Sequence, residues 1–374
     1  MSVPVSTPPL RGPEFGSYAA DEVTWLLKDL SQVALEGDLA ERERRIQSGK
    51  AHYAESLPIE YQPGEQYQEL FHAALRDSAA RLAEATGVVS ELVLAERDEV
   101  PTLVSLARAG TPVGILMRRW MAFAHSVDAP HYTISIVRDR GIDTMALDHI
   151  AARHRPESVV FVDGWTGKGA IQRELSAALA GYARAGGARL DDELAVLADP
   201  GSCTRTFGTR DDFLIASACL NSTVSGLVSR TVLNADHIGP AEFHGGKFYR
   251  HLREFDVSNL LLDTVSAQFA TVAPQVRTRL AAVRSGDREP RWSGWESMEQ
   301  LREEYGVSSV NFVKPGVGET TRVLLRRVPW MILVRAADLP EHQHIRILAA
   351  ERGVPIEVRS DLAYSCVGLI KEDA

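Results

Sequence analysis

The residue types best suited to chemistry lie in Val159–Ala170, which reads VVFVDGWTGKGA. Asp163 ends an apolar run, and three glycines and Lys168 follow before a helical pattern begins. Backbone N–H groups at such a turn form an anion site that a phosphate group fits. A nucleotide-binding P-loop would need a glycine five residues before Gly167 and Ser or Thr after Lys168, and neither is present. The turn predicts a phosphate site of another kind; the alternative is a tight turn whose glycines permit close packing.

Two earlier turns carry basic residues. Arg108, Ala109 and Gly110 follow the apolar run VPTLVSL, and Arg138 and Arg140 follow HYTISIV. Since ligands of open α/β sheets bind at the carboxyl ends of the strands, we expect all three turns to meet at one edge. The alternative for Arg108 is an ion pair with a surface carboxylate.

Short apolar runs alternate with helical patterns from about residue 100 onward. This alternation predicts right-handed βαβ units and a parallel sheet covered on both faces. The predicted strands are 100–106, 131–137, 158–163 and 192–199, and the predicted helices between and after them are 111–124, 142–154 and 170–187.

Helical periodicity precedes this region, from Asp21 to about Gly87, and a small αβ pattern follows a charged, turn-rich stretch near 287–292. The fold class is therefore α/β, with a helical N-terminal layer and a small C-terminal α/β sandwich. The predicted divisions are a disordered arm (1–14), the helical layer (15–95), the core (96–240), a helical extension with linker (241–290) and the last domain (291–374).

Composition limits the function classes. The chain has 374 residues, 45% hydrophobic and 24% charged, with a formal net charge of −9, which argues against coating nucleic acid or anionic membrane by bulk charge. It has no apolar run long enough for a membrane helix and no apolar signal-peptide segment. The spacing of the three cysteines fits neither a metal site nor a disulfide framework. This is typical of a protein in a reducing compartment. We expect a cytoplasmic protein that does not bind membranes.

A thiol protease is one alternative. Cys219 lies in SACLNSTVSGLVSRTVLN and Cys203 in DPGSCTRTFGT, while His237 and His244 follow downstream. An activated thiolate needs a histidine beside it, and no recognisable signature joins these residues. The usual role of a free cysteine, a small buried hydrophobe, stays open for both.

The turn VVFVDGWTGKGA resembles the ribose-phosphate loop of type I phosphoribosyltransferases. The resemblance implies that Asp163 binds the ribose hydroxyls and, indirectly, Mg²⁺. It also implies a set of phosphate-binding residues in the two turns. They are Gly164, Thr166, Gly167, Lys168, Gly169, Ala109 and Gly110. The family usually has a second acid where this chain has Gly164.

The same family resemblance assigns catalytic roles. Arg108 would bind the diphosphate, and Arg138 and Arg140 would lie in a loop that closes over the substrate; Asp163 completes the expected catalytic set. The implied substrate is Mg²⁺-bound 5-phosphoribosyl diphosphate, with a nucleobase-like acceptor or the reverse cleavage.

Longer stretches resemble a more specific family. SLARAGTPVGI, HYTISIVRDRGID, FVDGWTGKGAI and ACLNSTVSGLVSRTVLN are similar to bacterial phosphoribosyltransferase-like proteins of tellurite-resistance and stress operons, which carry a C-terminal Pelota-type RNA-binding domain. Members are also labelled StiP-type cysteine proteases. The expected function is thus a phosphoribosyltransferase coupled to RNA binding; the alternatives are a cysteine protease and a non-catalytic sensor of phosphosugars or nucleotides.

The last domain resembles the Pelota fold, in which a Gly-x-Asn-Glu-x-x-Lys stretch grips RNA. Gly316, Glu319 and Arg322 match that stretch, whereas Gly318 replaces the asparagine. Between positions 314 and 335 there are five basic residues and one acid. The resemblance predicts local, salt-sensitive binding of structured RNA. A protein-binding or purely structural domain is the alternative, and homodimerisation is left open.

Overall fold

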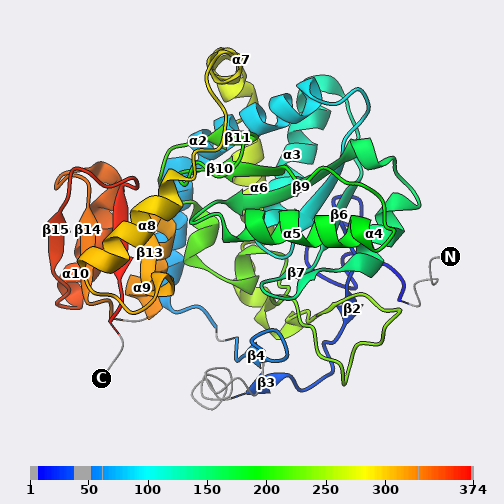
Figure 1. The fold of residues 1–374 in the computed structure, drawn as a ribbon, viewed down its shortest axis with the longest axis horizontal. Helices are drawn as coiled ribbons and strands as arrows, with labels where there is room; N and C mark the ends of the chain where they lie inside the picture. The colour runs from blue at the N-terminus through cyan, green and yellow to red at the C-terminus, as the bar shows by residue number, and fades with distance from the viewer. Residues whose placement is uncertain (1–6, 38–51, 61, 327, 372–374) are drawn as a thin grey trace.

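A parallel six-stranded sheet forms the centre of the larger of two bodies in the computed structural model, which describes residues 7–37, 52–60, 62–326 and 328–371 (Figure 1). Every pair of neighbouring strands in this sheet is parallel, as the alternating sequence pattern predicted. Across the sheet the strands are β1 (Thr24–Trp25), β6 (His131–Ile134), β5 (Thr102–Leu106), β9 (Val159–Trp165), β10 (Leu194–Ala198) and β11 (Phe207–Thr209).

Helices cover both faces of the sheet. One face carries α2 (Glu65–Ala95), α3 (Gly110–His125), α6 (Ser258–Ser266) and α7 (Phe269–Ser285), and the other carries α4 (Thr144–Ala151) and α5 (Ala170–Arg184). Alternate strand residues divide between the two cores: Val160 and Val162 of β9 join the first, and Val159 and Phe161 the second. Because both faces are covered, the strands are mostly apolar, and the polar residues Thr102, Ser105 and Thr133 that they contain are buried.

The N-terminal segment is not the helical layer that we expected. Its described part forms short strands instead: β2 (Lys28–Asp29) pairs with β12 (Gly245–Gly246), and β3 (Glu36–Gly37) with β4 (Leu57–Pro58). The consecutive residues Trp25, Leu26 and Leu27 are all fully buried, and their side chains divide between the two cores, which suits a buried strand. Residues 38–51 of the expected helical layer lie outside the described residues.

The described end of the expected disordered arm is also ordered. Leu10 forms an antiparallel bridge with Trp25, with N···O distances of 2.9 Å in both directions. Phe15 is buried against the Trp25 ring, at 5.9 Å between centroids. Leu10 and Phe15 thus both contact Trp25 of the edge strand β1.

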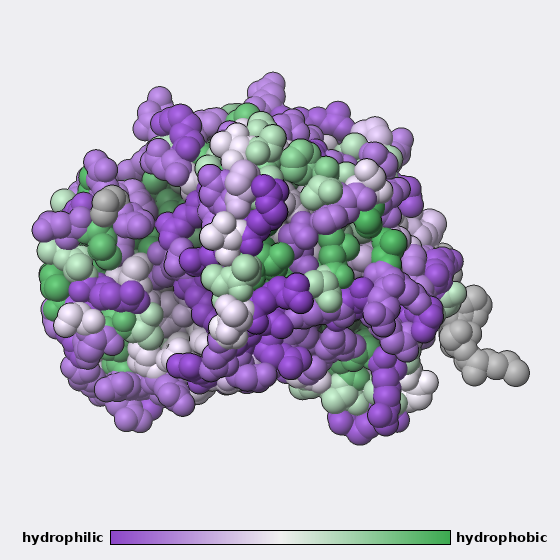
Figure 2. Space-filling model, turned by 90° about the horizontal axis from the view of Figure 1, so that it is seen from above, coloured by the Kyte–Doolittle hydropathy of each residue, from purple (hydrophilic) through white to green (hydrophobic). Residues whose placement is uncertain are grey.

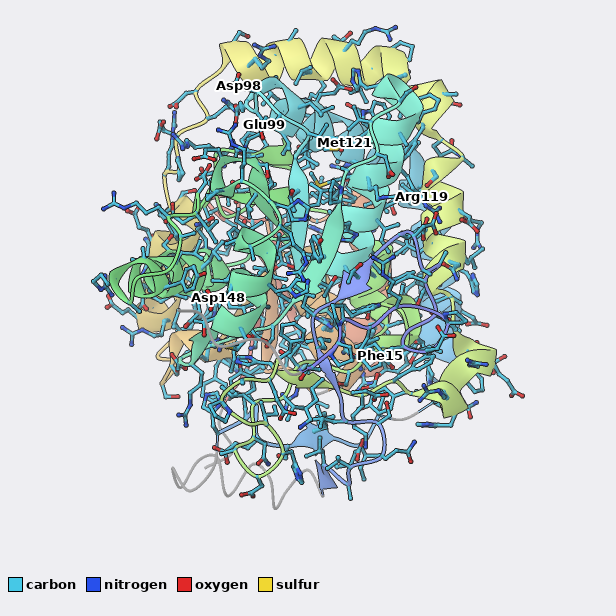
Figure 3. The ribbon with its side chains drawn as sticks, turned by 90° about the vertical axis from the view of Figure 1, so that its right-hand side faces the viewer. Phe15, Asp98, Glu99, Arg119, Met121 and Asp148 are labelled. Carbon is cyan, nitrogen blue, oxygen red and sulfur yellow. The ribbon has the colours of Figure 1, made fainter. Side chains whose placement is uncertain are left out.

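Arg119 of α3 ties this segment to the helices. Its Nε donates to Glu22 Oε1 at 2.5 Å and its Nη1 to Asp263 Oδ1 of α6 at 2.9 Å (Figure 3). Three segments far apart in the sequence therefore meet at one guanidinium.

Helix α2 departs from the sequence prediction at its end. Gly87 was expected to terminate it, but the helix continues to Ala95. A Cβ at Gly87 would lie 2.6 Å from Val276 Cγ2 and 2.8 Å from the Trp120 ring. This glycine therefore serves the close crossing of α2 with α7 and α3 rather than a helix end.

The remaining elements of the larger body are short. Strands β7 (Ile136–Val137) and β8 (Gly141–Ile142) form an antiparallel hairpin. Residues 211–220 contain the 3-10 helix η2 (Ala216–Cys219), and the strand β11 just before them was not predicted. Other 3-10 turns are η1 (Pro156–Ser158), η3 (Ser222–Val224) and η4 (Arg250–Phe255).

The C-terminal body is the small α/β sandwich that the sequence predicted. Its sheet has the order β13 (Val313–Pro315), β16 (Cys366–Leu369), β14 (Met331–Val334) and β15 (Ile356–Val358). Its helices are α8 (Ser293–Glu304), α9 (Gly316–Arg326) and α10 (Gln343–Glu351), with 3-10 turns η5 (Val310–Phe312) and η6 (Pro340–His342). Only the pair β14–β15 is parallel.

The two bodies share a hydrophobic core. Leu324 of α9 and Ile345 of α10 belong to the same buried cluster as Leu82 of α2 and Val160 of β9. On the face shown in Figure 2, hydrophilic residues dominate and hydrophobic ones form small separate patches. None of the described helices is long and apolar enough to cross a membrane.

Candidate functional site

The turns after β5 and β9 meet, as expected. The strand order reverses at these two neighbours, because β6 lies on the outer side of β5 and β10 on the outer side of β9. A Cβ on Gly110 would lie 2.3 Å from Val162 O, and one on Gly164 would lie 3.7 Å from Ala109 O. The glycines thus allow two backbones to approach at the switch point, where α/β sheets bind ligands.

Asp163 lies at this edge. One of its carboxylate oxygens accepts the Gly164 N–H at 2.8 Å, and no cation forms an ion pair with it among the described residues. Burial raises the pKa of Asp163 to about 7, and the Gly164 hydrogen bond offsets only part of that effect. A carboxyl that titrates near neutrality can take or give a proton at physiological pH.

The Thr-Gly-Lys-Gly turn is occupied by contacts to other parts of the chain. The Lys168 ammonium donates to Val310 O at 2.6 Å and Val313 O at 3.2 Å, and the Tyr364 hydroxyl donates to Gly167 O at 2.7 Å. Burial, followed by the nearby charge of Lys314, lowers the pKa of Lys168 to about 8. These residues hold the C-terminal body on the core, a role that the sequence did not indicate.

The other two residues of the turn, Thr166 and Gly169, also contact buried parts of the chain. The Thr166 hydroxyl donates to the buried Asp199 carboxylate. A Cβ on Gly169 would meet the Trp292 ring at 2.3 Å and Cys203 Sγ at 2.8 Å. Phosphate binding by this turn stays a prediction.

Arg108 lies in a cleft between the two bodies, which we call the basic cleft. Its Nη1 donates to Val228 O at 3.2 Å, and it has no ion pair with a described carboxylate. Burial lowers the pKa of Arg108, and the charge of Glu60 works in the opposite direction. The alternative for Arg108, an ion pair with a surface carboxylate, is therefore not formed in the described part of the chain.

The basic cleft has a volume of about 500 Å³ and brings together residues from distant segments. Arg322 also lies there, with its Nε buried and without a hydrogen-bond partner. The polar lining is Arg108, Arg230, Lys314, Arg322, Glu60, Glu319, Asn221, Asn311 and Tyr249. Of these, four are basic and two acidic, so the cleft favours anionic groups.

The β7–β8 hairpin, whose turn carries Arg138 and Arg140, does not line the basic cleft. The backbone N–H of Arg138 donates to the Tyr53 hydroxyl at 2.8 Å, and Arg140 lies 4.0 Å from Glu55. Arg140 lines a separate cavity of about 1140 Å³ together with Asp143 and His244. Of the four expected catalytic residues, the structure thus places the two hairpin arginines apart from Arg108.

The four expected RNA-binding residues have two different environments. A Cβ on Gly316 would lie 2.9 Å from Asp212 Oδ1, and one on Gly318 would lie 3.5 Å from Ala218 Cβ. Both glycines of α9 are therefore covered by the core. Glu319 and Arg322, 3.6 Å apart, line the basic cleft.

Asp212 is a residue that holds the C-terminal body on the core, and the sequence analysis did not identify it. Its Oδ1 accepts the Val317 N–H at 2.9 Å, and its Oδ2 accepts the Ser365 N–H at 2.8 Å and the Ser365 hydroxyl at 2.9 Å. Burial raises its pKa. The acidic pair Asp211-Asp212 near the next strand end was the available signal, because carboxylates favour helix N-termini.

The three thiols are all buried. Burial raises the pKa of Cys203 and of Cys219 to about 12 and raises that of Cys366. The charge of Asp199 adds to the effect at Cys203 and that of Asp212 at Cys366, whereas Arg322 lowers the pKa of Cys219.

No hydrogen bond joins a histidine to a thiol within the described ranges. His237 and His244 line the 1140 Å³ cavity, whose described lining contains no cysteine. His244 Nδ1 is 2.9 Å from Ser135 Oγ, and its backbone N–H donates to Asp143 Oδ2 at 2.6 Å. Burial lowers the pKa of His244, so its imidazole is neutral at physiological pH.

Comparison with protein families gives two matches. A model described as "Tellurite-like stress resistance cysteine protease StiP" matches residues 16–266, and one described as "PELOTA RNA binding domain" matches residues 292–372. The protein named "Cysteine protease StiP" of Acinetobacter baylyi (strain ATCC 33305 / BD413 / ADP1) is 37% identical over 373 residues, which covers 96% of this chain and 94% of that protein.

A solved structure gives only a weak match. It is a complex between the cystine C-S lyase C-DES and its reaction product cysteine persulfide, with 12% identity over 92% of this chain and 90% of that chain. Its TM-score of 0.25 is too low to support an argument about fold.

These matches confirm the resemblance to the stress-resistance family and to the Pelota domain, and they correct the expected activity. The family model and the relative are both described as cysteine proteases, so the expectation of a phosphoribosyltransferase that uses 5-phosphoribosyl diphosphate is wrong. The physical reason for the error is that a glycine-rich strand–helix turn with a lysine also serves domain docking. No group of three metal-ligating side chains occurs among the described His, Cys, Asp and Glu residues, and the Mg²⁺ cofactor stays a prediction.

Proposed function

Because this chain belongs to the StiP family, described as tellurite-like stress resistance cysteine proteases, we propose that it is a cysteine protease with Cys219 as nucleophile. The observation that carries the choice is the charge beside each thiol. The charged neighbour of Cys219 is the guanidinium of Arg322, whereas the largest charge effects on Cys203 and Cys366 come from carboxylates. The thiolate is the reactive form, and a cation stabilises it.

The basic cleft supports the same choice. Asn221, two residues after Cys219, lines the cleft together with Arg322 and Arg108. A peptide entering the cleft would approach the η2–η3 segment that carries the thiol. The cations of the cleft would attract acidic side chains or the carboxylate end of such a peptide.

The arrangement described here is the resting form of the proposed enzyme. Cys219 is 1% exposed, and α9 packs on η2, with Gly318 of α9 against Ala218. A thiol with a pKa of about 12 is protonated at neutral pH and does not attack a carbonyl. Cleavage therefore requires the packing of Gly318 on Ala218 to loosen enough for water and substrate to reach the thiol, while Arg322 of α9 stays beside it and the pKa of the thiol falls.

The proposed reaction follows nucleophilic catalysis. The Cys219 sulfur forms a bond to the peptide carbonyl carbon, the C–N bond breaks, and the amine leaves with a proton. Water then hydrolyses the thioester, which releases the acid and restores the thiol.

The test compares three single substitutions in the full chain. Cys219→Ser should abolish cleavage of fluorescein-labelled casein, whereas Cys203→Ser and Cys366→Ser should retain it if they remain folded by circular dichroism. Full activity of Cys219→Ser would contradict the assignment.

Alkylation gives a second readout that does not depend on a substrate. Iodoacetamide at pH 8 should label Cys219 of the folded protein at least tenfold more slowly than Cys219 of the urea-unfolded chain, because the thiol is 1% exposed and burial raises its pKa to about 12. Intact-protein mass spectrometry with the Cys219→Ser variant as control measures the rate. Equal labelling rates in the folded and unfolded protein would contradict the resting-state description.

We also propose that residues 292–372 bind RNA. The support is the match to the Pelota RNA-binding domain and the presence of Lys314 and Arg322 in the basic cleft. The glycine end of α9 is covered by Asp212, so the side of α9 that carries Arg322 is the proposed contact surface.

A further inference from the structure

A groove separate from the sites above runs between α2 of the core and α10 of the C-terminal body, and we call it the α2–α10 groove. It has a volume of about 770 Å³. The described lining consists of Gln66, Glu69, Leu70, Ala73, Ala74, Asp77, Ser78, Arg81, Phe213, Leu214, Glu341, Gln343, His344, Ile347, Leu348 and Glu351. None of these residues is a thiol or lines the basic cleft.

The floor of the groove is apolar. Phe213, Leu214 and Leu348 are buried beneath it, and Ala73 of α2 is half-buried in its lining. Ile347 is 52% exposed, so a large aliphatic side chain faces water inside a concave surface. Such exposure in a concavity is typical of a protein-binding surface, whereas a lone aliphatic side chain on a convex surface needs no explanation.

The rim of the groove is acidic. Four exposed carboxylates surround the floor: Glu69 and Asp77 on α2, and Glu341 and Glu351 at the two ends of the α10 segment. Arg81 is the one lysine or arginine in the described lining.

The charge of Arg81 is largely committed to neighbours. Its guanidinium pairs with Asp211 at 3.0 Å, lies 3.9 Å from Glu341, and stacks 4.1 Å above the Phe213 ring. His344 adds no positive charge at neutral pH, since burial, followed by the neighbouring His342, lowers its pKa to about 4. The groove is therefore an apolar strip with a negative border.

We propose that the α2–α10 groove binds an amphipathic helical segment of a partner protein, with an apolar stripe flanked by lysine or arginine. The charge of the rim selects the basic flanks, and the apolar floor between two helices fits side chains at i, i+3, i+4 and i+7 of a helix. A segment seated there contacts the core and the C-terminal body at once, so its binding stabilises their present arrangement. This inference does not depend on the protease assignment.

The test uses fluorescein-labelled helical peptides of about 18 residues, long enough for helix formation on binding. The probe has a leucine stripe with lysine at the other positions, a second peptide has the same composition with the stripe scrambled, and a third has glutamate in place of lysine. Fluorescence anisotropy with the full chain should show binding of the first peptide and at least tenfold weaker binding of the other two.

Substitutions in the protein locate the site. Ile347→Ser and Glu69→Lys should each weaken binding of the leucine–lysine peptide about tenfold. Val358→Ser is the matched control for the first, because Val358 of β15 is 53% exposed outside the groove; Glu157→Lys, with a side chain 72% exposed, is the control for the second. Both controls should leave the affinity unchanged.

Three outcomes would overturn the proposal. Equal binding of the scrambled peptide would show that the helical stripe is not recognised. Unchanged affinity of the Ile347→Ser variant would show that the peptide does not bind in the groove. Concentration-dependent dimerisation in sedimentation, abolished by Ile347→Ser, would show that a second copy of this chain is the occupant instead.

Discussion

At the scale of single residues, Asp163 shows what a pattern can and cannot predict. The sequence placed its carboxylate at the carboxyl end of a central strand, and it lies there. The sequence could not indicate its environment, because the raised pKa results from burial by turns that come from other parts of the chain. Lys168 gives the same lesson: its neighbours, Val310 and Val313, lie more than 140 positions away.

The stability of the protein should depend on pH through Asp163. Its folded-state pKa of about 7 lies above its ordinary value near 3.9, so the unfolded chain loses this proton at lower pH. The group therefore destabilises the fold increasingly as pH rises from about 4 to 7, and by a constant amount above that range.

Asp163→Asn removes this effect while keeping an acceptor for the Gly164 N–H. The variant should gain stability over the original protein as pH rises from 5 to 7, by at most about 3 kcal/mol, because this range spans two pH units and one pKa unit corresponds to about 1.4 kcal/mol. Urea unfolding at pH 5, 6, 7 and 8 measures the difference. Asp98→Asn, at an exposed side chain, should show none; a difference for Asp163→Asn that is independent of pH would refute the explanation.

At the scale of elements, local patterns located most strands and helices of the α/β core but misjudged those fixed by packing. The helical periodicity predicted α2 correctly, but its predicted end at Gly87 was wrong. Gly87 is needed for the close packing of α2 against Trp120 and Val276 and does not end the helix. The N-terminal strands were missed because runs as short as Thr24–Trp25 carry no period. Their pairing with distant strands defines them.

Gly87→Ala should therefore destabilise the protein, although alanine is the better helix former by about 1 kcal/mol. The added methyl would lie 2.6 Å from Val276 Cγ2 and 2.8 Å from the Trp120 ring, and overpacking of this kind costs about 1–3 kcal/mol. Thermal denaturation measures the change.

Gly181→Ala in α5 is the matched control, because the nearest atom to its added methyl is Arg184 Nη2 at 3.8 Å. It should raise stability by up to about 1 kcal/mol. If both substitutions stabilised the protein, the packing explanation for Gly87 would be wrong.

At the scale of the whole molecule, the α/β character of the C-terminal body was predictable, but its docking on the core was not. A shared buried cluster and the contacts of Asp212 with Val317 and Ser365 join the two bodies. These residues come from segments more than 100 positions apart, and no local pattern relates them. The docking creates the basic cleft, in which the expected RNA-binding residue Arg322 meets Arg108.

Binding of RNA should depend on this cleft rather than on net charge. Arg322→Gln should weaken binding of transfer RNA by the full chain without regard to sequence, and should lower the slope of log affinity against log salt by about 1, because one phosphate contact is lost. Filter binding between 50 and 200 mM salt measures both.

Arg302→Gln is the control for that experiment, because Arg302 lies on α8 of the same body and pairs with Glu299 outside the cleft. It should leave affinity and slope unchanged. An equal loss in both variants would indicate diffuse attraction rather than a site.

The bridge between Leu10 and Trp25 has a consequence for solubility. Strand β1 is the outermost strand of the parallel sheet, and an uncovered edge offers unpaired N–H and C=O groups to any passing strand. Leu10 occupies those groups of Trp25, and at the opposite edge Gly208 of β11 lies against the backbone of Ala85 in α2. Leu10 thus protects this edge of the sheet from pairing with other chains, and shortening the chain past Leu10 would expose the edge and favour aggregation.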